Sequence, residues 1–523
     1  MTLSVDTDVI VVGAGPTGLM LAGDLALAGV QVIVLEREPG IPSTARAGAV
    51  FGQILDVLRH RGLLERLEAA AGGPVSTPPA IPFGNLYLAL ARLPEPAMPA
   101  LRIPQPTLQR VLAEWAAGLG AGLRFGLDLL AVSDEGDCDG DGGRVAVAVR
   151  GPDGHGRLTA RWVVGCDGPS SPVRAAVGIG FPGETYSEVN RLATVGVHPS
   201  VTLRPDGDLE VPGLGLLRSG FTRTERGTFA FARSTPGVIG VQTTEDDGVP
   251  AALAGPLTLT EFRQSVRRVL GVDLPLGEVT RLSRYGYQGR IADRYRAGRV
   301  LVAGDAAHQF PATGIGINVG MTDAVNLAWK LAAQVRGWAP PGLLDTYHDE
   351  RHTAAGRHLM HARAQALLRR EQDPAVAGMR ALFSELAAHE ETLRHLGELV
   401  AGTSARYPAE GGHPLAGAPL PELGAVRWET PLLGTGSAVL LDFTGREGLR
   451  DTAAAWDGRV DVVLAPPSST REARPAGALL VRPDAFVAWA AGVDEPEPDT
   501  AASLTAALHR WCGEPVVGGR RSG

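Results

Sequence analysis

The first forty residues change from one hydrophobic pattern to another and back. Residues 9–12 are a continuous apolar, β-branched run, which is typical of a buried parallel strand. From Leu19 to Ala28 small and large apolar residues alternate, as expected of a helix that lies on a sheet, and Gly29 follows as a helix stop. Residues 32–35 form a second apolar run. The pattern therefore predicts a strand, a helix and a second strand in succession.

Further along, the patterns predict a discontinuous α/β domain, an inserted sheet and a separate C-terminal domain. Residues 163–165 and 300–303 repeat the buried-strand pattern, and residues 320–400 are helical in pattern. Between these segments, short alternating runs with frequent turns predict an antiparallel sheet. Additional elements are expected at 105–119 (helix), 123–132 and 144–149 (strands), and, beyond 421, strands at 438–443, 460–464 and 478–481 alternating with helices at 446–456 and 501–512.

The predicted boundaries follow from these changes of character. The first domain takes residues 1–74, 101–185 and 291–400, and the sheet domain takes 75–100 and 186–290. A Gly/Pro-rich linker is expected at 401–421, and the C-terminal α/β domain at 422–523.

The glycines after the first strand indicate a dinucleotide site. Gly13, Gly15 and Gly18 form G-x-G-x-x-G between the strand and the helix, where they permit a tight turn, close approach of a pyrophosphate and close helix packing. The helix N-terminus favours a diphosphate. Glu36 ends the second strand, where a carboxylate suits two ribose hydroxyls and repels a 2′-phosphate.

Composition narrows the class of protein. A chain of 523 residues is too long for one core. Its net charge of −8 argues against a nucleic-acid partner. No run of about 18 apolar residues predicts a membrane span, and no basic leader precedes the first strand. The three scattered cysteines, Cys138, Cys166 and Cys512, predict a reduced cytoplasmic protein without disulfides.

Two clusters of potential metal ligands are present, one of aspartates and one of histidines, and neither pattern supports a metal site. Asp137, Asp139 and Asp141 resemble the start of a calcium loop, but Ala148 stands where the bidentate acid belongs, so a solvated hairpin tip is expected. Four histidines on the predicted helix, at 348, 352, 358 and 361, are expected to be structural or solvated. We therefore expect no metal.

Two further motifs follow buried strands. "VVGCDGPSSPVR" (163–174) places Asp167 at a strand end, with Arg174 beyond it. "VLVAGDAAHQFPATGIGINVG" (300–320) places Asp305 at another strand end, turns through Pro311 and enters a helix near Gly316. A strand-end carboxylate can bind a ribityl hydroxyl, and N–H groups of residues 316–318 can stabilise negative charge at a flavin edge.

In this order and spacing, the three motifs resemble the group A flavin-dependent aromatic hydroxylases, the family of para-hydroxybenzoate hydroxylase. The nearest branch is the bacterial aromatic polyketide hydroxylases, because "LLVRPDAFVAW" (479–489) is similar to a phrase in their thioredoxin-like C-terminal domain. The chain has no C-x-x-C, so thioredoxin chemistry is not expected. The resemblance implies a Rossmann-like FAD-binding domain, an inserted antiparallel-sheet substrate domain and the thioredoxin-like tail.

The resemblance also implies the site. FAD would be bound non-covalently as the resident cofactor, by the residues Gly13, Gly15, Gly18, Glu36, Arg37, Arg46, Gln105, Asp167, Asp305, Pro311, Gly316, Ile317 and Asn318. Pro311, Gly314 and Gly316 would lie near the flavin, and no catalytic base is assigned. Alternation on the predicted strands makes Phe83, Tyr87, Phe221, Phe229 and Phe231 candidates for substrate contact. The chain departs from the family pattern at Thr313, Ile315, Ala485 and Ala490.

The expected reaction is hydroxylation of a polycyclic aromatic polyketide through a C4a-hydroperoxyflavin, with O2 and transiently bound NADPH as co-substrates. Baeyer–Villiger insertion next to a ring ketone stays open as the alternative, because the residues do not distinguish the two. An auxiliary FAD protein with little oxygenase activity is a further rival. A halogenase is disfavoured, because the only lysine, Lys330, lies on a helix beyond the flavin motif. The protein is expected to be a monomer or a homodimer.

Overall fold

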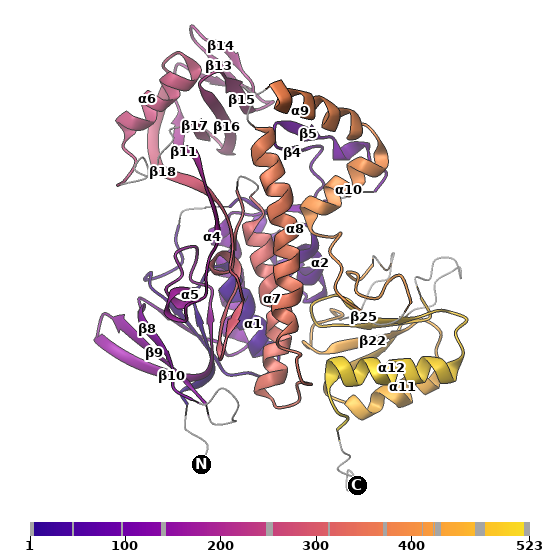
Figure 1. Cartoon of the computed structure of the whole chain (residues 1–523). Coiled ribbons are helices and arrows are strands. Elements are labelled where there is room, and N and C mark those ends of the chain that lie inside the picture. Colours follow the sequence, from indigo (N-terminus) through magenta and orange to yellow (C-terminus); the bar gives the residue numbers. More distant parts are fainter. Residues whose placement is uncertain are drawn as a thin grey trace. The chain divides into compact units, whose positions relative to one another are not determined.

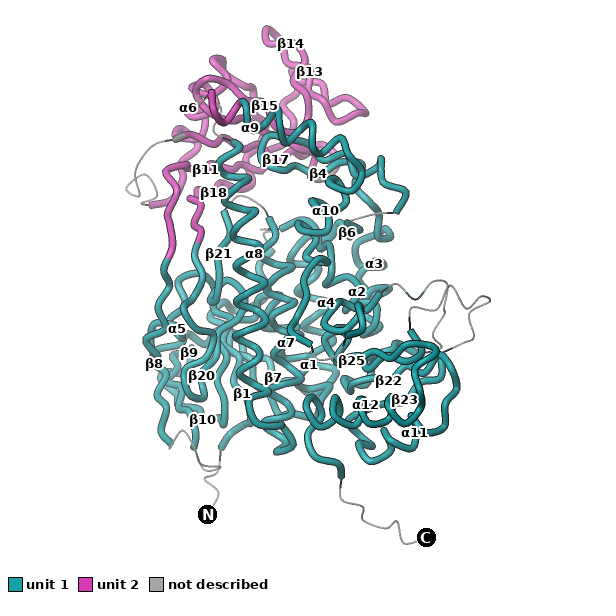
Figure 2. Tube along the Cα trace, turned by 45° about the vertical axis from the view of Figure 1, so that its right-hand side comes forward, with its two compact units in different colours: residues 1–182, 290–369, 378–523 teal, residues 183–289, 370–377 magenta. Residues whose placement is uncertain are grey.

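The computed structural model describes residues 5–43, 47–95, 98–136, 143–246, 255–311, 314–369, 374–409, 412–421, 423, 430–465 and 476–516. Its contacts divide the chain into two compact units. The first unit comprises residues 1–182, 290–369 and 378–523, and the second comprises 183–289 and 370–377 (Figure 2). Within the described residues, no helix combines the length and apolar character needed to cross a membrane.

A parallel sheet forms the centre of the first unit. Its strands β1 (Thr7–Val12), β2 (Val32–Glu36), β7 (Gly122–Phe125), β10 (Gly154–Gly165) and β20 (Val300–Val302) pair in the order β20-β10-β1-β2-β7, with β19 (Arg296–Ala297) antiparallel at the edge. Helix α1 (Pro16–Leu27) joins β1 to β2, which confirms the predicted strand–helix–strand unit. The glycine motif, Glu36, Asp167 and Asp305 all follow carboxyl ends of neighbouring parallel strands, at one edge of the sheet.

The single strand predicted at 123–132 is wrong. The chain turns at Gly126, whose φ of +75° suits glycine, and divides the segment into β7 and β8 (Asp128–Asp134). β8 pairs antiparallel with β9 (Val145–Gly151), and β9 pairs with the first half of β10. Residues 137–142, which carry the three aspartates of the suspected calcium loop, lie outside the described residues.

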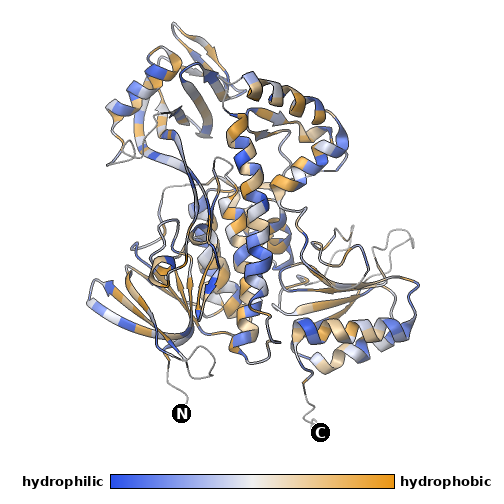
Figure 3. Ribbon diagram, in the orientation of Figure 1, coloured by the Kyte–Doolittle hydropathy of each residue, from blue (hydrophilic) through white to orange (hydrophobic). Residues whose placement is uncertain are grey.

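Two long helices of the first unit, α7 (Gly316–Val335) and α8 (Thr346–Leu368), run side by side (Figure 1). α8 carries hydrophilic and hydrophobic residues along its whole length (Figure 3), and many of its polar side chains are buried. The helices that precede the C-terminal domain in this unit also include α2 (Gln53–His60), α3 (Leu64–Ala71), α4 (Gln105–Gly118), α5 (Pro172–Ala176), α9 (Pro374–Leu386, of which 374–377 belong to the second unit) and α10 (Glu390–Ala401).

Residues 75–100, predicted to join the substrate sheet, belong by their contacts to the first unit. Strands β4 (Ile81–Phe83) and β5 (Leu86–Leu88) form a small hairpin, and β3 (Ala49–Phe51) pairs with β6 (Ala100–Arg102). Phe83 is buried in a cluster with Leu368 of α8 and Leu393 of α10, which explains the assignment. We therefore propose the domain boundaries given above with residues 75–100 moved to the first domain.

The second unit is an antiparallel sheet covered by one helix. Strands pair in the order β15 (Gly220–Thr224), β16 (Gly227–Thr235), β17 (Val238–Asp246), β11 (Gly183–Val197) and β18 (Leu276–Ile291). A smaller sheet contains β12 (Thr202–Leu203), β13 (Leu209–Val211) and β14 (Gly215–Leu217). Helix α6 (Leu259–Leu270) packs its buried side chains on one face of the larger sheet. β18 continues into the first unit, where it pairs with β21 (His308–Gln309).

The C-terminal residues form a mixed sheet with two helices. The strand order is β23 (Val460–Leu464), β22 (Ala438–Asp442), β24 (Ala478–Val481), β25 (Val487–Ala491), and the helices are α11 (Glu447–Ala453) and α12 (Glu497–Cys512). Val439, Leu441 and Val481 share one hydrophobic core with residues of α1 and α7. The C-terminal domain is therefore part of the first unit rather than a free appendage.

A buried ionic cluster joins this domain to α7 and α8. Arg482 donates to both oxygens of Glu350, at 2.7 Å each, and its Nε donates to Asp484 at 3.0 Å. Lys330 Nζ donates to Glu350 at 2.7 Å, and Asn326 donates to Glu350 and Asp484. All five side chains are at least nine-tenths buried. We call these five residues the junction cluster.

The turn that carries Arg482 and Asp484 is held in two further ways. Arg61, paired with Asp24 at 2.8 Å, donates to the carbonyl of Pro483 at 2.9 Å. Ala485 adopts a φ of +62°, and no other non-glycine residue in the described ranges has a positive φ. Left-handed backbone costs an alanine about 1–2 kcal/mol, so its surroundings must impose the conformation.

Candidate functional site

The glycine loop after β1 is shaped by two kinds of glycine. Gly13 has a φ of +105°, and a Cβ there would collide with the carbonyl oxygen of Cys166. A Cβ on Gly18 would collide with the carbonyl oxygen of Gly13. Gly15 has no atom within 4 Å of the Cβ position and stands at the N-terminus of α1. Gly13 and Gly18 thus serve packing, whereas Gly15 leaves open space in front of a positive helix end.

Glu36 is oriented beside this loop. Its Oε2 accepts the N–H of Ala14 at 2.8 Å, and its Oε1 accepts the N–H of Glu38 at 3.0 Å. On the other side, the buried Gln109 of α4 donates to the carbonyl of Ala14 at 3.0 Å and accepts from Gln105 at 3.3 Å. Sequence reasoning named Gln105 but missed Gln109, which lies one helical turn later and faces the same way.

Asp305 occupies the short turn η3 (Gly304–Ala306) after β20. Its side chain is exposed although both neighbours are buried, so it points out of the packed layer. The Cβ position of Gly316, at the start of α7, lies 3.4 Å from Asp305 Oδ1. The Cβ positions of both Gly304 and Gly320 meet Thr17 of α1. The N-termini of α1 and α7 and the Asp305 turn therefore converge.

The loop after β10 is tied to the same place. Asp167 accepts the N–H of Val173 at 2.9 Å at the start of α5, while no group of the described residues makes a well-formed hydrogen bond to its other, buried oxygen. Burial raises the pKa of Asp167. Arg174 donates to the carbonyls of Ala306 and Pro169 and lies 3.9 Å from the ring centre of Phe181. Arg174 thus joins the Asp167 loop to the Asp305 turn.

Beneath the Asp305 turn lies a fully buried carboxylate, Asp323 of α7. It accepts the N–H of Gly304 at 3.1 Å, lies 2.6 Å from His308 Nε2 and accepts Arg351 Nε at 2.7 Å. Burial alone would raise the pKa of Asp323, but His308 and Arg351 lower it overall. Arg351 also donates to the hydroxyl of Tyr407 at 2.8 Å. This network fixes the turn from below.

Comparisons with known proteins agree with this geometry. A family described as "FAD binding domain" matches residues 6–362, and one described as "Aromatic-ring hydroxylase, C-terminal" matches residues 413–515. The chain belongs to the FAD-binding aromatic-ring hydroxylase family. It is a flavoprotein monooxygenase with FAD as cofactor, and the expected family and fold class are confirmed.

Three relatives show the range of this family. The chain is 38% identical to a 12-dehydrotetracycline 5-monooxygenase/anhydrotetracycline 6-monooxygenase of Streptomyces rimosus, covering 98% of this chain and 99% of the relative. A solved structure of an aromatic hydroxylase from angucycline biosynthesis is 39% identical, with a TM-score of 0.84 and coverage of 98% and 100%. A dialkyldecalin synthase of Streptomyces rugosporus is 36% identical, with coverage of 97% and 98%.

The residues present fit FAD. The open space at Gly15 suits the pyrophosphate, and Glu36 suits the adenosine ribose. Asp305 suits a hydroxyl of the ribityl chain, and the first N–H groups of α7, at Gly316 and Ile317, suit the electron-rich edge of the flavin. One oxygen of Asp167 and the Nδ2 of Asn318 are buried near these loops and have no hydrogen-bond partner in the described part of the chain, and a ligand satisfies groups of this kind.

The remaining predicted cofactor residues are placed less directly. Asn318 is buried and its Oδ1 accepts the N–H of Phe51 at 2.9 Å. Pro311 is buried, and Gly314 is exposed with a φ of +67°. Arg37 is exposed, with Glu38 as an ion-pair partner at 3.8 Å. Arg46 and Thr313 lie outside the described residues.

The structure revises the proposed substrate contacts. Phe229 and Phe231 are buried in the core between the sheet of the second unit and α6, and Phe83 is buried against Phe383. Strand alternation identified their shared face correctly but could not say that α6 covers it. Phe221 and Tyr87 are exposed, at 55% and 58%.

The other candidates are the four histidines of α8 and the lysine of α7. His358 and His361 contact each other, His348 and His352 pack on Tyr295, and within the described residues no group of side chains is arranged to hold a metal. Lys330 is fully buried in the junction cluster, where burial lowers its pKa to about 8.

Proposed function

We propose that this protein hydroxylates a polycyclic aromatic polyketide, with NADPH and O2 as co-substrates. The observation that carries the proposal is the end-to-end similarity to tetracycline and angucycline hydroxylases, combined with an open cradle at Gly15, Glu36 and Asp305. FAD would be held non-covalently by the residues predicted from the sequence, with Gln109 added.

When bound, FAD supplies hydride acceptance from NADPH and activation of O2. The chain's own residues bind and orient it. The positive end of α7 favours negative charge beside Asp305, and Arg174 and Asp323 hold the turn in place. No residue is assigned as a catalytic base.

We propose the face of the second unit's sheet opposite α6 as the substrate side. Strand register places Phe221, Ala230, Gln242 and Leu192 in one row across this face. Gln242 and Thr244 both donate to Asn190, so the face offers hydrogen-bonding groups beside an exposed aromatic ring. An aromatic surface with a few polar groups suits a polyketide of fused phenolic rings.

Two alternative reactions can be stated, and one of them has specific support. Baeyer–Villiger insertion uses the same cofactor and co-substrates. The second alternative is a ring-forming reaction, which is supported by the similarity to a dialkyldecalin synthase, because that name describes formation of a ring system.

The test is incubation of the FAD-bound protein with NADPH, ¹⁸O2 and either an anhydrotetracycline or an angucyclinone. Hydroxylation predicts consumption of NADPH and O2 and a product one oxygen heavier that resists mild alkaline hydrolysis. An ester-forming insertion gives the same mass but opens under alkali. An isomeric product formed without NADPH would indicate cyclisation. A Gly15→Ala variant, matched by Gly48→Ala, tests whether activity depends on the cradle.

We further propose that the enzyme works in the cytoplasm as a monomer or homodimer. Cys166 and Cys512 are free thiols, which supports a reducing compartment. Light scattering after size exclusion measures the oligomeric state directly.

A further inference from the structure

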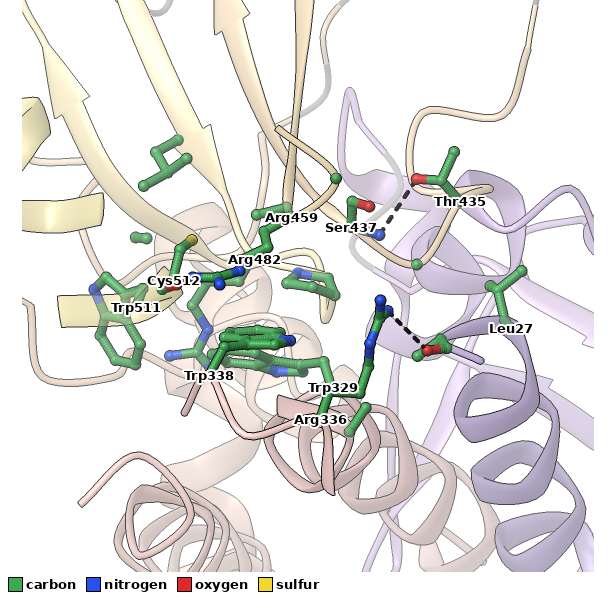
Figure 4. Close-up of a pocket in the computed structure, with 18 residues that line it drawn as sticks. Leu27, Trp329, Arg336, Trp338, Thr435, Ser437, Arg459, Arg482, Trp511 and Cys512 are labelled. Carbon is green, nitrogen blue, oxygen red and sulfur yellow. Dashed lines mark hydrogen bonds between the residues drawn. The ribbon is translucent and has the colours of Figure 1, made fainter. Parts of the chain in front are cut away.

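A cavity of about 160 Å³ lies between the C-terminal domain and the end of the first domain, inside the first unit (Figure 4). Trp329 and Trp338 line it from the end of α7 and the segment that follows, and Trp511 lines it from α12. It is distinct from the cofactor site, because Gly316 and Trp329 are 13 residues apart on α7, or about 20 Å along the helix.

Two arginines at this cavity have no carboxylate partner among the described residues. Arg336 donates to the carbonyl of Ala28 at 3.1 Å, and Arg459 donates to the carbonyls of Cys512 and Glu514. Burial lowers the pKa of Arg459, and the charge of Arg336 lowers it further, so the two charges disfavour each other. The third arginine, Arg482, is already neutralised within the junction cluster. The cavity therefore has an excess of positive charge.

The walls add aromatic surface and an unused donor. The guanidinium of Arg459 lies 5.3 Å from the ring centre of Trp338. The indole N–H of Trp329 is buried and has no acceptor in the described part of the chain. A buried donor without a partner is costly, and an anionic acceptor removes that cost.

The volume limits the ligand to one ring. A cavity of about 150 Å³ holds benzene in an engineered protein, so a cavity of this size suits a six-membered ring rather than a nucleotide or a tetracycle. Two cationic forks suit a planar carboxylate, and tryptophan faces suit an aromatic ring.

We propose that this cavity binds a monocyclic aromatic carboxylate, separately from the flavin site. The ring lies among the tryptophans and the carboxylate faces Arg336 and Arg459. Because both domains contribute walls, the ligand stabilises the docking of the C-terminal domain.

Benzoate titrated into the FAD-bound protein is the test, with tryptophan fluorescence excited at long wavelength as the readout. Saturable quenching is expected with a dissociation constant of about 1 mM or tighter, an ordinary affinity for nine non-hydrogen atoms. The visible flavin spectrum should not change in parallel. Benzylamine, which reverses the charge, should not quench, and cyclohexanecarboxylate, which lacks the aromatic ring, should bind more weakly.

Arg336→Gln and Arg459→Gln should each weaken benzoate about tenfold, because each removes a charge-assisted hydrogen bond. Arg150→Gln, at an exposed arginine of β9 paired with Asp128, is the matched control. Arg336 is exposed, so its variant remains informative even if Arg459→Gln fails to fold. Unchanged benzoate affinity in Arg336→Gln, or quenching that follows the flavin spectrum, would overturn the proposal.

Discussion

Replacing Glu350 with glutamine tests how the C-terminal domain is held. In the junction cluster, Glu350 accepts four hydrogen bonds, two from Arg482 and one each from Lys330 and Asn326, all at 2.7 Å, and it is 3% exposed. Glutamine keeps one acceptor oxygen but turns an NH2 group toward donors. The substitution also removes one negative charge, so that Asp484 is the only anion left in the cluster to balance Arg482 and Lys330.

The expected loss is about 3–5 kcal/mol, the cost of removing one partner from a buried ion pair. With a urea dependence of about 2 kcal/mol/M, the unfolding midpoint should fall by roughly 2 M. Tryptophan fluorescence is a suitable probe, because the ring centres of Trp329 and Trp511 lie 5.2 and 4.7 Å from the central carbon of the Arg482 guanidinium. FAD binding should persist, since Glu350 is not part of the cradle.

Glu390→Gln is the matched control, because Glu390 is exposed and pairs with Arg394 one helical turn away. Such a pair contributes about 0.3–0.5 kcal/mol. The double variant Lys330→Met/Glu350→Met should lose less stability than Glu350→Gln, because it leaves Arg482 and Asp484 as a neutral pair. A Glu350→Gln midpoint no lower than that of Glu390→Gln would refute the reasoning.

Three further changes test the cofactor site. Gly15→Ala should fold normally, because its methyl group meets nothing within 4 Å, but it should weaken FAD binding at least tenfold in a fluorescence titration. Gly13→Ala should instead reduce the yield of folded protein, because its methyl group would collide with the backbone. Full FAD affinity in Gly15→Ala would contradict the cradle. Asp305→Ala should raise the FAD dissociation constant more than Glu36→Gln does. Alanine leaves a cofactor hydroxyl unpaired, at a cost of about 1–3 kcal/mol, whereas glutamine keeps an acceptor. Equal dissociation constants for the two variants would count against this order. The pKa of Asp323 is lowered in the folded protein, so its contribution to stability is present above the ordinary pKa of 3.8 and is lost as the pH falls through the lower folded value. Asp323→Asn should therefore flatten the acid side of the stability curve measured by urea unfolding, and an unchanged slope would argue against that role.

The local patterns were sufficient for the parts of the fold that depend on neighbours in sequence. The G-x-G-x-x-G loop, its flanking strands and Glu36 follow from short-range rules of turn geometry and burial, and all were predicted. The prediction of one strand at 123–132 is wrong because the chain turns at Gly126, which has a positive φ. The apolar pattern continues on both sides of this glycine, so only the residue type indicates the turn.

The hydrogen bonds that hold the Asp305 turn in place could not be predicted, because they join residues that are far apart in the sequence. Asp323 pairs with Arg351 and His308, and nothing in a single sequence links a buried carboxylate to those partners. Phe229 and Phe231 show the complementary limit. Alternation places them on one face of a strand, but only the position of α6 reveals that this face is core.

The junction cluster also sets a condition on synthesis. Glu350 and the arginine that neutralises it are 132 residues apart, with the arginine nearer the C-terminus. At about 5–20 residues per second, a ribosome takes roughly 7–26 seconds to make that stretch. During this interval α7 and α8 carry Glu350 and Lys330 without Arg482, and the apolar residues of α1 and α7 lack Val481. The core shared with α1 and α7 therefore cannot be completed until this stretch has been made, and we expect nascent chains paused before residue 482 to be more exposed to aggregation and proteolysis than the full-length chain.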